Sequence, residues 1–493
     1  MKLDRDVCSR ARLARDWRFD GLFFLGVKTT GIFCRPVCPA KAPKEENVDY
    51  FPTAAAAIEA GFRPCLRCRP ESAPGNRVGG DSSLVERALA IIREGGLNDG
   101  TIEELATRVG TGSRHLRRLF IRHLGAAPVQ IANAQRTLFA KKLLSETHLS
   151  VTQAAMAAGF GSLRQFNDVF KEICGLTPTE IRKQIQERDP RSDAACDLHL
   201  AYRPDFDWHY MLNFMNPRLI PGVEEISESA YRRTFRIPGG SAGWLEITNY
   251  PERHSLKLSI HTDRLDDLMR IQQRVRVMFD LETNLEPVRE HLKQEPMLAG
   301  IIEEFPAVRL PGAWDPFEFA VRAVLGQQIS VKAATTLAGR VAAACGQSCG
   351  DLYPKGLTHF FPTAEEVANA DISELGITGK RQETIRVLVN AVLNQTISLE
   401  RGQALETFVE AFTSLKGIGP WTAHYLGMRA LGLTDAFPAS DLGIRKALAT
   451  NSRLPSEGET NLRAEQWRPW RAYAALYLWK LAAKKEKIQE KAQ

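Results

Sequence analysis

Apolar residues recur at helical spacing over two long stretches of the chain and alternate with polar residues over a third. Residues 82–186 show the helical spacing, in Leu84, Val85, Ala88, Leu89 and Ile92 and again in Leu138, Leu143 and Leu144. From residue 315 onward the spacing is again helical and is broken by Gly and Pro turns. Three segments alternate instead, with Pro or Gly between them: residues 231–237, 244–248 and 255–260. This pattern predicts helical regions on either side of a set of strands.

Loop-forming composition marks three breaks, at residues 72–80, at 186–193 and, more weakly, near 284–290. A chain of 493 residues has room for three or four domains of ordinary size. We predict four: residues 1–75, 82–188, 196–285 and 286–485. The expected fold class is multidomain and mainly α, with a small α/β module, an all-α region, a β-rich α+β domain and an all-α C-terminal domain.

Composition is that of a globular protein, with 44% hydrophobic and 25% charged residues. No apolar run approaches the roughly 18 residues that span a bilayer, and residues 1–17 lack the apolar core of a signal peptide. We therefore expect a cytoplasmic protein with no membrane partner. Nothing in the sequence signals an oligomer, so a monomer is expected.

Positive charge is concentrated in the first third of the chain. Residues 1–188 hold 29 Lys and Arg against 20 Asp and Glu, whereas the remainder holds 36 against 38. Such a basic excess favours a surface that binds nucleic-acid phosphates. A solvated basic face would give the same count.

Four of the nine cysteines form two close pairs. Cys34 and Cys38 are followed after a gap by Cys65 and Cys68, as C-x3-C and C-x2-C. Two such pairs can supply four thiolates to one Zn²⁺ ion, either as a purely structural staple or as a reactive site. The other five, Cys8, Cys174, Cys196, Cys345 and Cys349, lack this spacing and are interpreted as core or surface thiols.

The stretch TTGIFCRPVCPAK, with ENVDYF and AAGFRPCLRC, resembles the N-terminal zinc domain of the Ada family. The resemblance implies that Cys34 is also a nucleophile that accepts a methyl group from a methylated DNA phosphate. Zinc keeps such a thiol deprotonated, so that it stays nucleophilic near neutral pH. It further implies that Thr30, Lys41 and Arg63 contact the DNA backbone. The Pro-Cys-His-Arg motif of the second Ada methyltransferase is absent, so repair of O6-methylguanine is not expected.

Two segments have the layout of a helix-turn-helix. In the first, Thr101 and Glu104 form a capping box, Gly110 suits the turn, and residues 113–121 carry Arg114, Arg117 and Arg118. In the second, Gly159 suits the turn and residues 162–170 carry Arg164, Gln165 and Asn167. These side chains can reach base edges or phosphates. The run GFGSLRQFNDVFKEICGLTPTEIR resembles AraC-type regulators, which implies promoter DNA and RNA polymerase as partners.

Residues 408–425 predict a helix, a tight turn with Gly417 and Gly419, and a second helix whose N-terminus can hold a DNA phosphate. About twenty residues further on, FPASDLG places Asp441 before another helix. Together these segments resemble the helix-hairpin-helix glycosylases, in which an aspartate at this place is catalytic. A carboxylate there can stabilise positive charge on a sugar and orient water. A helix N-cap is the alternative role for Asp441.

From residue 198 to about 481 the chain resembles AlkA-like glycosylases of the DNA-3-methyladenine glycosylase II type. The resemblance implies a pocket for an extruded cationic base, made by Phe214, Trp421, Tyr425 and Trp479. The same resemblance implies that residues 196–285 are similar to the N-terminal domain of AlkA-like enzymes. Trp467 and Trp470 are assigned to the core.

One departure and two further expectations accompany that resemblance. Trp421 stands where lyase relatives carry a lysine, so hydrolysis without strand cleavage is expected. Gln328 stands where AlkA-like enzymes have an apolar wedge. A monovalent cation at the hairpin is a further expectation. The predicted function is an alkylated-base glycosylase fused to a methylphosphotriester-sensing regulator; the alternative is a regulator whose glycosylase half only binds DNA.

Overall fold

The computed structural model describes residues 4–76, 84–98, 100–186, 196–450 and 453–492. Of the break expected at 72–80, residues 73–76 are described and form no helix or strand, and the rest lies outside the described residues, as does nearly all of the break expected at 186–193. The third expected break is wrong as a loop, because Leu285–Leu292 forms helix α12, capped by Asn284. The Asn284 side chain accepts a hydrogen bond from the backbone N–H of Glu286, and this cap converts a polar stretch into a helix start.

The first module is a four-stranded sheet with two helices. Its strands are β1 (Phe24–Val27), β2 (Ile32–Cys34), β3 (Val48–Phe51) and β4 (Arg63–Pro64), in the order β3-β1-β2-β4, and its helices are α1 (Arg5–Ala14) and α2 (Ala54–Glu59). Only β2 and β4 run parallel, and β2 ends at Cys34. The sheet therefore delivers Cys34 to the same edge as the loop that follows β4.

The described residues from 84 to 186 form helices, which confirms the helical spacing of this region. They are α3 (Leu84–Arg93), α4 (Ile102–Arg108), α5 (Ser113–Leu124), α6 (Pro128–Glu146), α7 (Val151–Ala157), α8 (Leu163–Cys174) and α9 (Pro178–Gln186). The capping box of Thr101 and Glu104 is confirmed at the start of α4. The long helix α6 joins the two helix-turn-helix pairs, α4–α5 and α7–α8, and is buried over most of its length.

Helix α6 also fastens this region to its neighbours through two consecutive buried lysines. Nζ of Lys141 lies 2.6 Å from both carboxylate oxygens of Glu71 in the first module. Lys142 pairs with Glu146 at 3.0 Å and donates to the backbone oxygen of His199 in the next domain. Since buried charges persist only when paired, these contacts hold α6 to two other parts of the chain.

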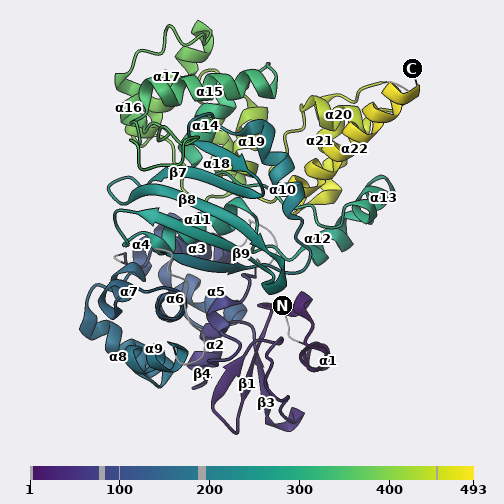
Figure 1. Cartoon of the computed structure of the whole chain (residues 1–493). Helices are drawn as coiled ribbons and strands as arrows, with labels where there is room; N and C mark the ends of the chain where they lie inside the picture. Colours follow the sequence, from purple (N-terminus) through teal and green to yellow (C-terminus); the bar gives the residue numbers. More distant parts are fainter. Residues whose placement is uncertain (1–3, 77–83, 99, 187–195, 451–452, 493) are drawn as a thin grey trace.

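The five-stranded antiparallel sheet has the order β5-β9-β8-β7-β6. Its strands are β5 (Asp197–Ala201), β6 (Glu224–Ser227), β7 (Ala230–Arg236), β8 (Ala242–Tyr250) and β9 (Ser255–Thr262). The three strands predicted from alternation are confirmed as β7, β8 and β9, while the short strands β5 and β6 are additions. In Figure 1 this sheet lies between the helices of residues 84–186 and the C-terminal helices.

The other regular elements among the described residues from 197 onward are helices, joined by loops. They include α10 (Trp208–Met215), α11 (Leu268–Met278), α12, α13 (Pro296–Glu304), α14 (Pro316–Leu325), α15 (Val331–Cys345), α16 (Ala364–Asn369), α17 (Gly379–Leu393), α18 (Leu405–Thr413), α19 (Pro420–Arg429), α20 (Leu442–Leu448), α21 (Glu457–Ala464) and α22 (Arg471–Ala492). Trp467 and Trp470 are buried in the core of this region, as predicted. Among the described residues, every helix is too short or too polar to cross a bilayer.

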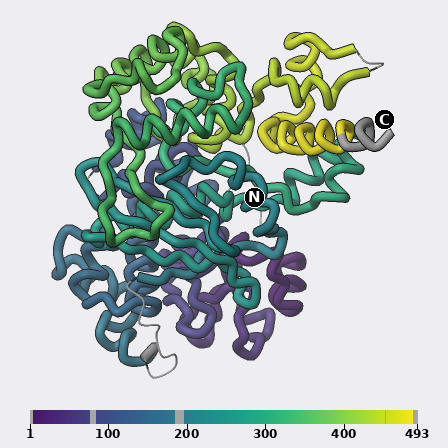
Figure 2. The backbone as a smooth tube through the Cα atoms, turned by 45° about the horizontal axis from the view of Figure 1, so that its top comes forward, coloured from purple at the N-terminus to yellow at the C-terminus, as the bar shows by residue number. Residues whose placement is uncertain are grey.

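Ion pairs join the helix-turn-helix region to the C-terminal half. They are Arg93–Glu282 at 2.8 Å, Arg401–Glu94 at 3.2 Å and Arg108–Glu400 at 2.8 Å. The side chain of Arg87 adds a hydrogen bond to the backbone oxygen of Gly402. In Figure 2 the first module, in purple, lies on the helix-turn-helix side of the molecule, away from α22 in yellow.

Candidate functional site

The four cysteines that are closely spaced in the sequence lie together in the first module. The sulfur atoms of Cys34, Cys38, Cys65 and Cys68 lie within 4.8 Å of one another. Four thiolates around Zn²⁺, with Zn–S bonds of about 2.3 Å, place sulfurs about 3.8 Å apart, so the cluster fits the ion. Backbone N–H groups of Arg67 and Arg35 donate to the sulfurs of Cys65 and Cys68, each at 3.4 Å. We call these four residues the thiolate cluster.

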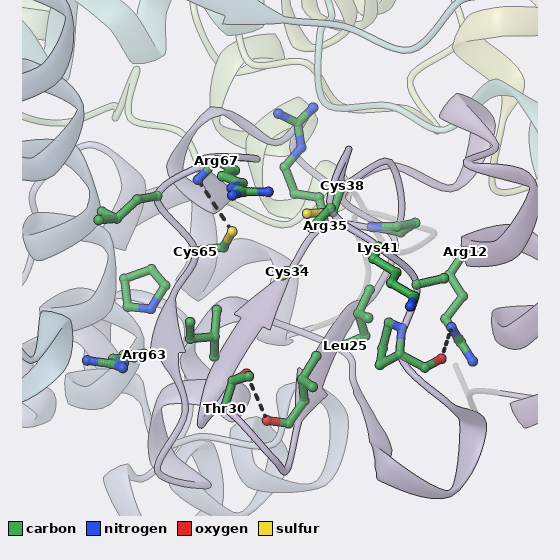
Figure 3. A pocket seen from close by; sticks show the side chains of 18 of the residues that line it. Arg12, Leu25, Thr30, Cys34, Arg35, Cys38, Lys41, Arg63, Cys65 and Arg67 are labelled. Carbon is green, nitrogen blue, oxygen red and sulfur yellow. Dashed lines mark hydrogen bonds between the residues drawn. The ribbon is translucent and has the colours of Figure 1, made fainter. Parts of the chain in front are cut away.

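A pocket of about 720 Å³ opens beside the thiolate cluster, and Cys34, Cys38 and Cys65 line it whereas Cys68 does not. Figure 3 shows basic side chains around this pocket, contributed by Arg12, Lys41, Arg63 and Arg67. Thr30 also lines it and donates its hydroxyl to the backbone oxygen of Val27. The structure therefore brings Thr30, Lys41 and Arg63 together around the mouth that leads to Cys34.

The two helices expected to contact bases, α5 and α8, present polar side chains to solvent. Arg114, Arg117 and Arg118 are exposed on α5, and Arg164 and Gln165 are exposed on α8. The opposite faces of both helices are buried, through Leu116 and Phe120 in α5 and through Phe166 and Phe170 in α8. This arrangement leaves the polar faces free for a duplex.

The glycine hairpin lies between α18 and α19. Gly417 has φ of +90°, and a Cβ there would lie 2.0 Å from the hydroxyl oxygen of Thr384. Gly419 is the N-cap of α19, and its Cβ position faces open space. The side-chain amide of Gln327 donates to the backbone oxygen of Gly417 at 3.0 Å. The turn thus requires glycine at 417, and the free N-terminus of α19 faces outward.

Asp441 caps helix α20, so the capping role predicted as its alternative is confirmed: Oδ1 accepts from the backbone N–H of Ile444 at 3.1 Å. The carboxylate has two further donors. The indole N–H of Trp479 donates to Oδ1 at 2.8 Å, and that of Trp421 donates to Oδ2 at 3.2 Å. Three donors fix the carboxylate while it remains only half-buried.

Aromatic rings line a groove of about 1550 Å³ in front of Asp441. Trp421 and Tyr425 stack with ring centroids 5.1 Å apart, and Trp479 stands edge-on to Tyr425 at 6.3 Å. Phe214, from α10, lines the same groove. We call Phe214, Trp421, Tyr425 and Trp479 the aromatic slot; all four predicted pocket residues and Asp441 come together there.

Sequence reasoning missed the arginines behind this slot. The guanidinium of Arg218 lies 4.1 Å from the ring centroid of Phe214, and that of Arg429 lies 4.7 Å from it. Arg429 also donates to the hydroxyl of Tyr425 at 3.1 Å. Burial lowers the pKa of Arg429 to about 10. Burial alone would raise the pKa of the Tyr425 phenol. The positive charges of Arg429, Arg218 and Arg322 outweigh this effect and lower that pKa below its usual value. Their spacing in the chain gives no signal, because they meet only in the fold.

Gln328 lies at the end of the groove near the hairpin. It is exposed and has φ of +55°, in the left-handed region that non-glycine residues seldom adopt. The preceding residue, Gln327, is held at two points. Its backbone oxygen accepts a hydrogen bond from Arg381, and its side-chain amide donates to the backbone oxygen of Gly417. A strained, projecting residue held by its neighbours is typical of a site that touches a ligand.

Family models match four consecutive parts of the chain. Residues 7–71 match the metal binding domain of Ada, residues 105–184 a helix-turn-helix domain, residues 197–315 the AlkA N-terminal domain, and residues 321–472 the HhH-GPD superfamily base excision DNA repair proteins. With the thiolate cluster, the hairpin and the aromatic slot, they define a base-excision DNA glycosylase fused to a zinc-binding and helix-turn-helix DNA-binding half.

A relative that matches nearly the whole chain makes the assignment specific. The probable bifunctional transcriptional activator/DNA repair enzyme AlkA of Mycobacterium tuberculosis is 39% identical over 481 residues, which cover 97% of this chain and 96% of the relative. The chain belongs to this family of bifunctional transcriptional activator/DNA repair enzymes.

Proteins that match only part of this chain are also similar to it. DNA-3-methyladenine glycosylase 2 of Escherichia coli is 32% identical over 287 residues, 57% of this chain and 95% of that protein. The solved structure of the 3-methyladenine DNA-glycosylase from Archaeoglobus fulgidus superposes with a TM-score of 0.50 at 22% identity, over 58% of this chain and 98% of that one. That likeness shows a shared fold.

Proposed function

We propose that the glycosylase half hydrolyses the N-glycosidic bond of alkylated purines, of the 3-methyladenine and 7-methylguanine class, with Asp441 as the catalytic carboxylate. The observation that carries this proposal is the pair of indole hydrogen bonds from Trp421 and Trp479 to Asp441. They hold the carboxylate against the slot that would receive the base. The name of the relative from Escherichia coli, DNA-3-methyladenine glycosylase 2, supports 3-methyladenine as a substrate.

The chemistry follows from this geometry. An extruded base enters the aromatic slot, where ring faces attract a cationic purine by up to about 2 kcal/mol. The bond from the sugar carbon to the base nitrogen breaks, the electron pair leaves with the base, and positive charge develops on the sugar. Asp441 stabilises that charge and orients the water that adds to the sugar carbon. Gln328, projecting at the hairpin end, would fill the gap in the duplex.

Strand cleavage should be absent. Glycosylases that also cut the strand attack the sugar with a lysine at the place of Trp421. Here an indole occupies that place, and its N–H is engaged by Asp441. We therefore propose simple hydrolysis that leaves an abasic site.

Base release tests the proposal directly. Asp441→Asn keeps the cap acceptor and the shape of the side chain but removes the charge, and should lower the release of methylated purines at least about 100-fold with DNA affinity retained. Glu457→Gln, an exposed acid at the start of α21, is the matched control and should match the unaltered protein. Released bases are separated by chromatography. Release by Asp441→Asn at the control rate would remove this carboxylate from the mechanism.

We further propose that Cys34 is the methyl acceptor of the regulatory half. The residues that would hold zinc are those of the thiolate cluster, and bound zinc would keep the sulfurs as thiolates. The sulfur of Cys34 attacks the methyl carbon of a neutral phosphotriester, an S–C bond forms, the C–O bond breaks, and a phosphodiester anion leaves. Loss of one negative charge at the cluster would strengthen binding of DNA to the basic pocket, with Thr30, Lys41 and Arg63 as backbone contacts.

Mass spectrometry tests this transfer. After exposure to methylphosphotriester DNA, one added methyl group is expected on Cys34 and none on Cys38, its neighbour in the same cluster. An unmodified Cys34 in zinc-loaded protein would leave the cluster a structural role only.

The regulatory partners remain predictions. Promoter recognition by Arg114, Arg117, Arg118, Arg164 and Gln165 is supported by their exposure on α5 and α8. RNA polymerase as a partner, a monovalent cation at the hairpin, a monomeric state and the four domain boundaries also stay predictions. The alternative, a regulator whose glycosylase half only binds DNA, would require that Asp441→Asn change nothing.

A further inference from the structure

Helix α19 carries a histidine that faces away from the aromatic slot. Trp421 and Tyr425 of this helix line the groove, whereas His424 contacts the loop that leads to Asp441. The Nδ1 atom of His424 accepts a hydrogen bond from the backbone N–H of Phe437 at 3.2 Å. The same helix therefore supplies both the base-binding rings and an anchor for the loop of the carboxylate.

The anchored residue is a fixed point of that loop. The ring of Phe437 is buried and stands edge-on to Trp467, with centroids 5.8 Å apart. Its backbone oxygen accepts from the N–H of Ala439 at 3.0 Å, and the backbone oxygen of Pro438 accepts from the N–H of Asp441 at 2.9 Å. A short series of turns thus connects the backbone at Phe437 to the carboxylate, so a shift at one end moves the other.

This contact needs a neutral imidazole whose Nδ1 has a free lone pair. Burial is the main cause that lowers the pKa of His424 to about 4, and the positive charges of Arg471 and Arg468 act in the same direction, against Glu406. The ring is therefore an acceptor throughout the neutral range. A buried backbone N–H without an acceptor would be costly, so the loop depends on this side chain.

We propose that His424 is a positioning residue of the glycosylase: its Nδ1 holds the Phe437–Asp441 loop in register with the aromatic slot and so places the carboxylate beside the sugar. The inference rests on the proposed role of Asp441. His424 touches neither base nor sugar, so its effect should fall on the rate of bond cleavage and not on DNA binding.

Two substitutions distinguish the role of the His424 hydrogen-bond acceptor from that of the side-chain volume. Asparagine places its side-chain oxygen where the histidine has Nδ1, whereas leucine has similar bulk and no acceptor. His424→Leu should lower the single-turnover rate of base release about 10- to 100-fold, because small misplacements of a reacting group have effects of this size. Affinity for a duplex with an abasic-site analogue should change less than about threefold. His424→Asn should restore the rate to within about threefold of the unaltered protein.

The outcomes are distinct. An unchanged rate in His424→Leu overturns the inference, and so does a His424→Asn variant as slow as His424→Leu at equal melting temperature. A loss of affinity that equals the loss of rate would indicate a merely structural role and would also overturn it. Asp441→Asn is measured alongside: if that variant still releases bases, the proposed function itself fails, whereas its inactivity together with a normal His424→Leu refutes only the positioning role.

Discussion

The buried ion pair between Lys141 and Glu71 offers a strong test of how residues 4–186 hold together. The two side chains are 0% and 1% exposed, and both carboxylate oxygens lie 2.6 Å from Nζ. Lys141→Met keeps the length of the side chain but leaves Glu71 buried without its cation. Breaking a buried pair from one side costs about 3–5 kcal/mol. In a unit of this size, each kcal/mol of lost stability lowers the melting temperature by about 2–4 °C. The melting temperature should therefore fall by about 6–20 °C.

Calorimetry combined with release of zinc to a metal-sensitive dye would follow this transition, since the dye reports unfolding of the thiolate cluster. Glu71→Met should be as damaging as Lys141→Met, and the double variant should recover most of the loss because two apolar groups replace the pair. Lys446→Met is the control, since its pair with Glu486 is exposed and contributes less than about 1 kcal/mol. Single variants within about 1 kcal/mol of the unaltered protein, or strictly additive losses, would refute the reasoning.

Three further predictions concern the hairpin, the metal and pH. Gly417→Ala should weaken DNA binding at least about tenfold in fluorescence anisotropy, because φ is +90° and the added Cβ meets Thr384. Gly458→Ala in α21, where an added Cβ meets no atom within 4 Å, should bind normally, and equal affinities of the two variants would contradict this prediction. Chelation of zinc should expose residues 4–76 to proteolysis while base release continues, and a protease-resistant chelated module would contradict a structural role for the metal. Burial lowers the pKa of His424 from about 6.5 in the unfolded chain to about 4, so the stability that the neutral imidazole contributes is complete above pH 6.5. This contribution is lost as pH falls toward 4, by up to about 3 kcal/mol, and denaturant melts of His424→Asn should lack this pH-dependent component.

Local patterns in the sequence predicted the elements that depend on local physics. The capping box of Thr101 and Glu104, the helices around Gly110 and Gly159, and the alternating strands follow from hydrogen bonds and periodicity within a few residues. The zinc ligands followed from spacing, because two close pairs leave few alternatives. The family resemblance supplied the aromatic slot, whose members are too far apart for any pattern to join them.

What the sequence did not reveal depends on tertiary contacts. Lysines are normally exposed, so nothing in KKLLSE indicated that α6 is covered on both sides and that Lys141 and Lys142 are paired within the core. The indole donors to Asp441 lie 20 and 38 residues away in the chain. His424 gives no sequence signal at all, because its acceptor role exists only once the loop has folded against α19.

The ion pairs between the helix-turn-helix region and the C-terminal half have a consequence for experiments in different buffers. Dissolved salt screens charges beyond a Debye length of about 8 Å at physiological ionic strength, and it also drives duplexes off cationic protein surfaces. Arg108 and Glu400 are solvent-accessible, so their attraction weakens under the same conditions that release DNA. The steepness with which affinity falls as salt rises therefore combines counterion release from the duplex with loosening between the two halves. An isolated C-terminal half would report only the first effect.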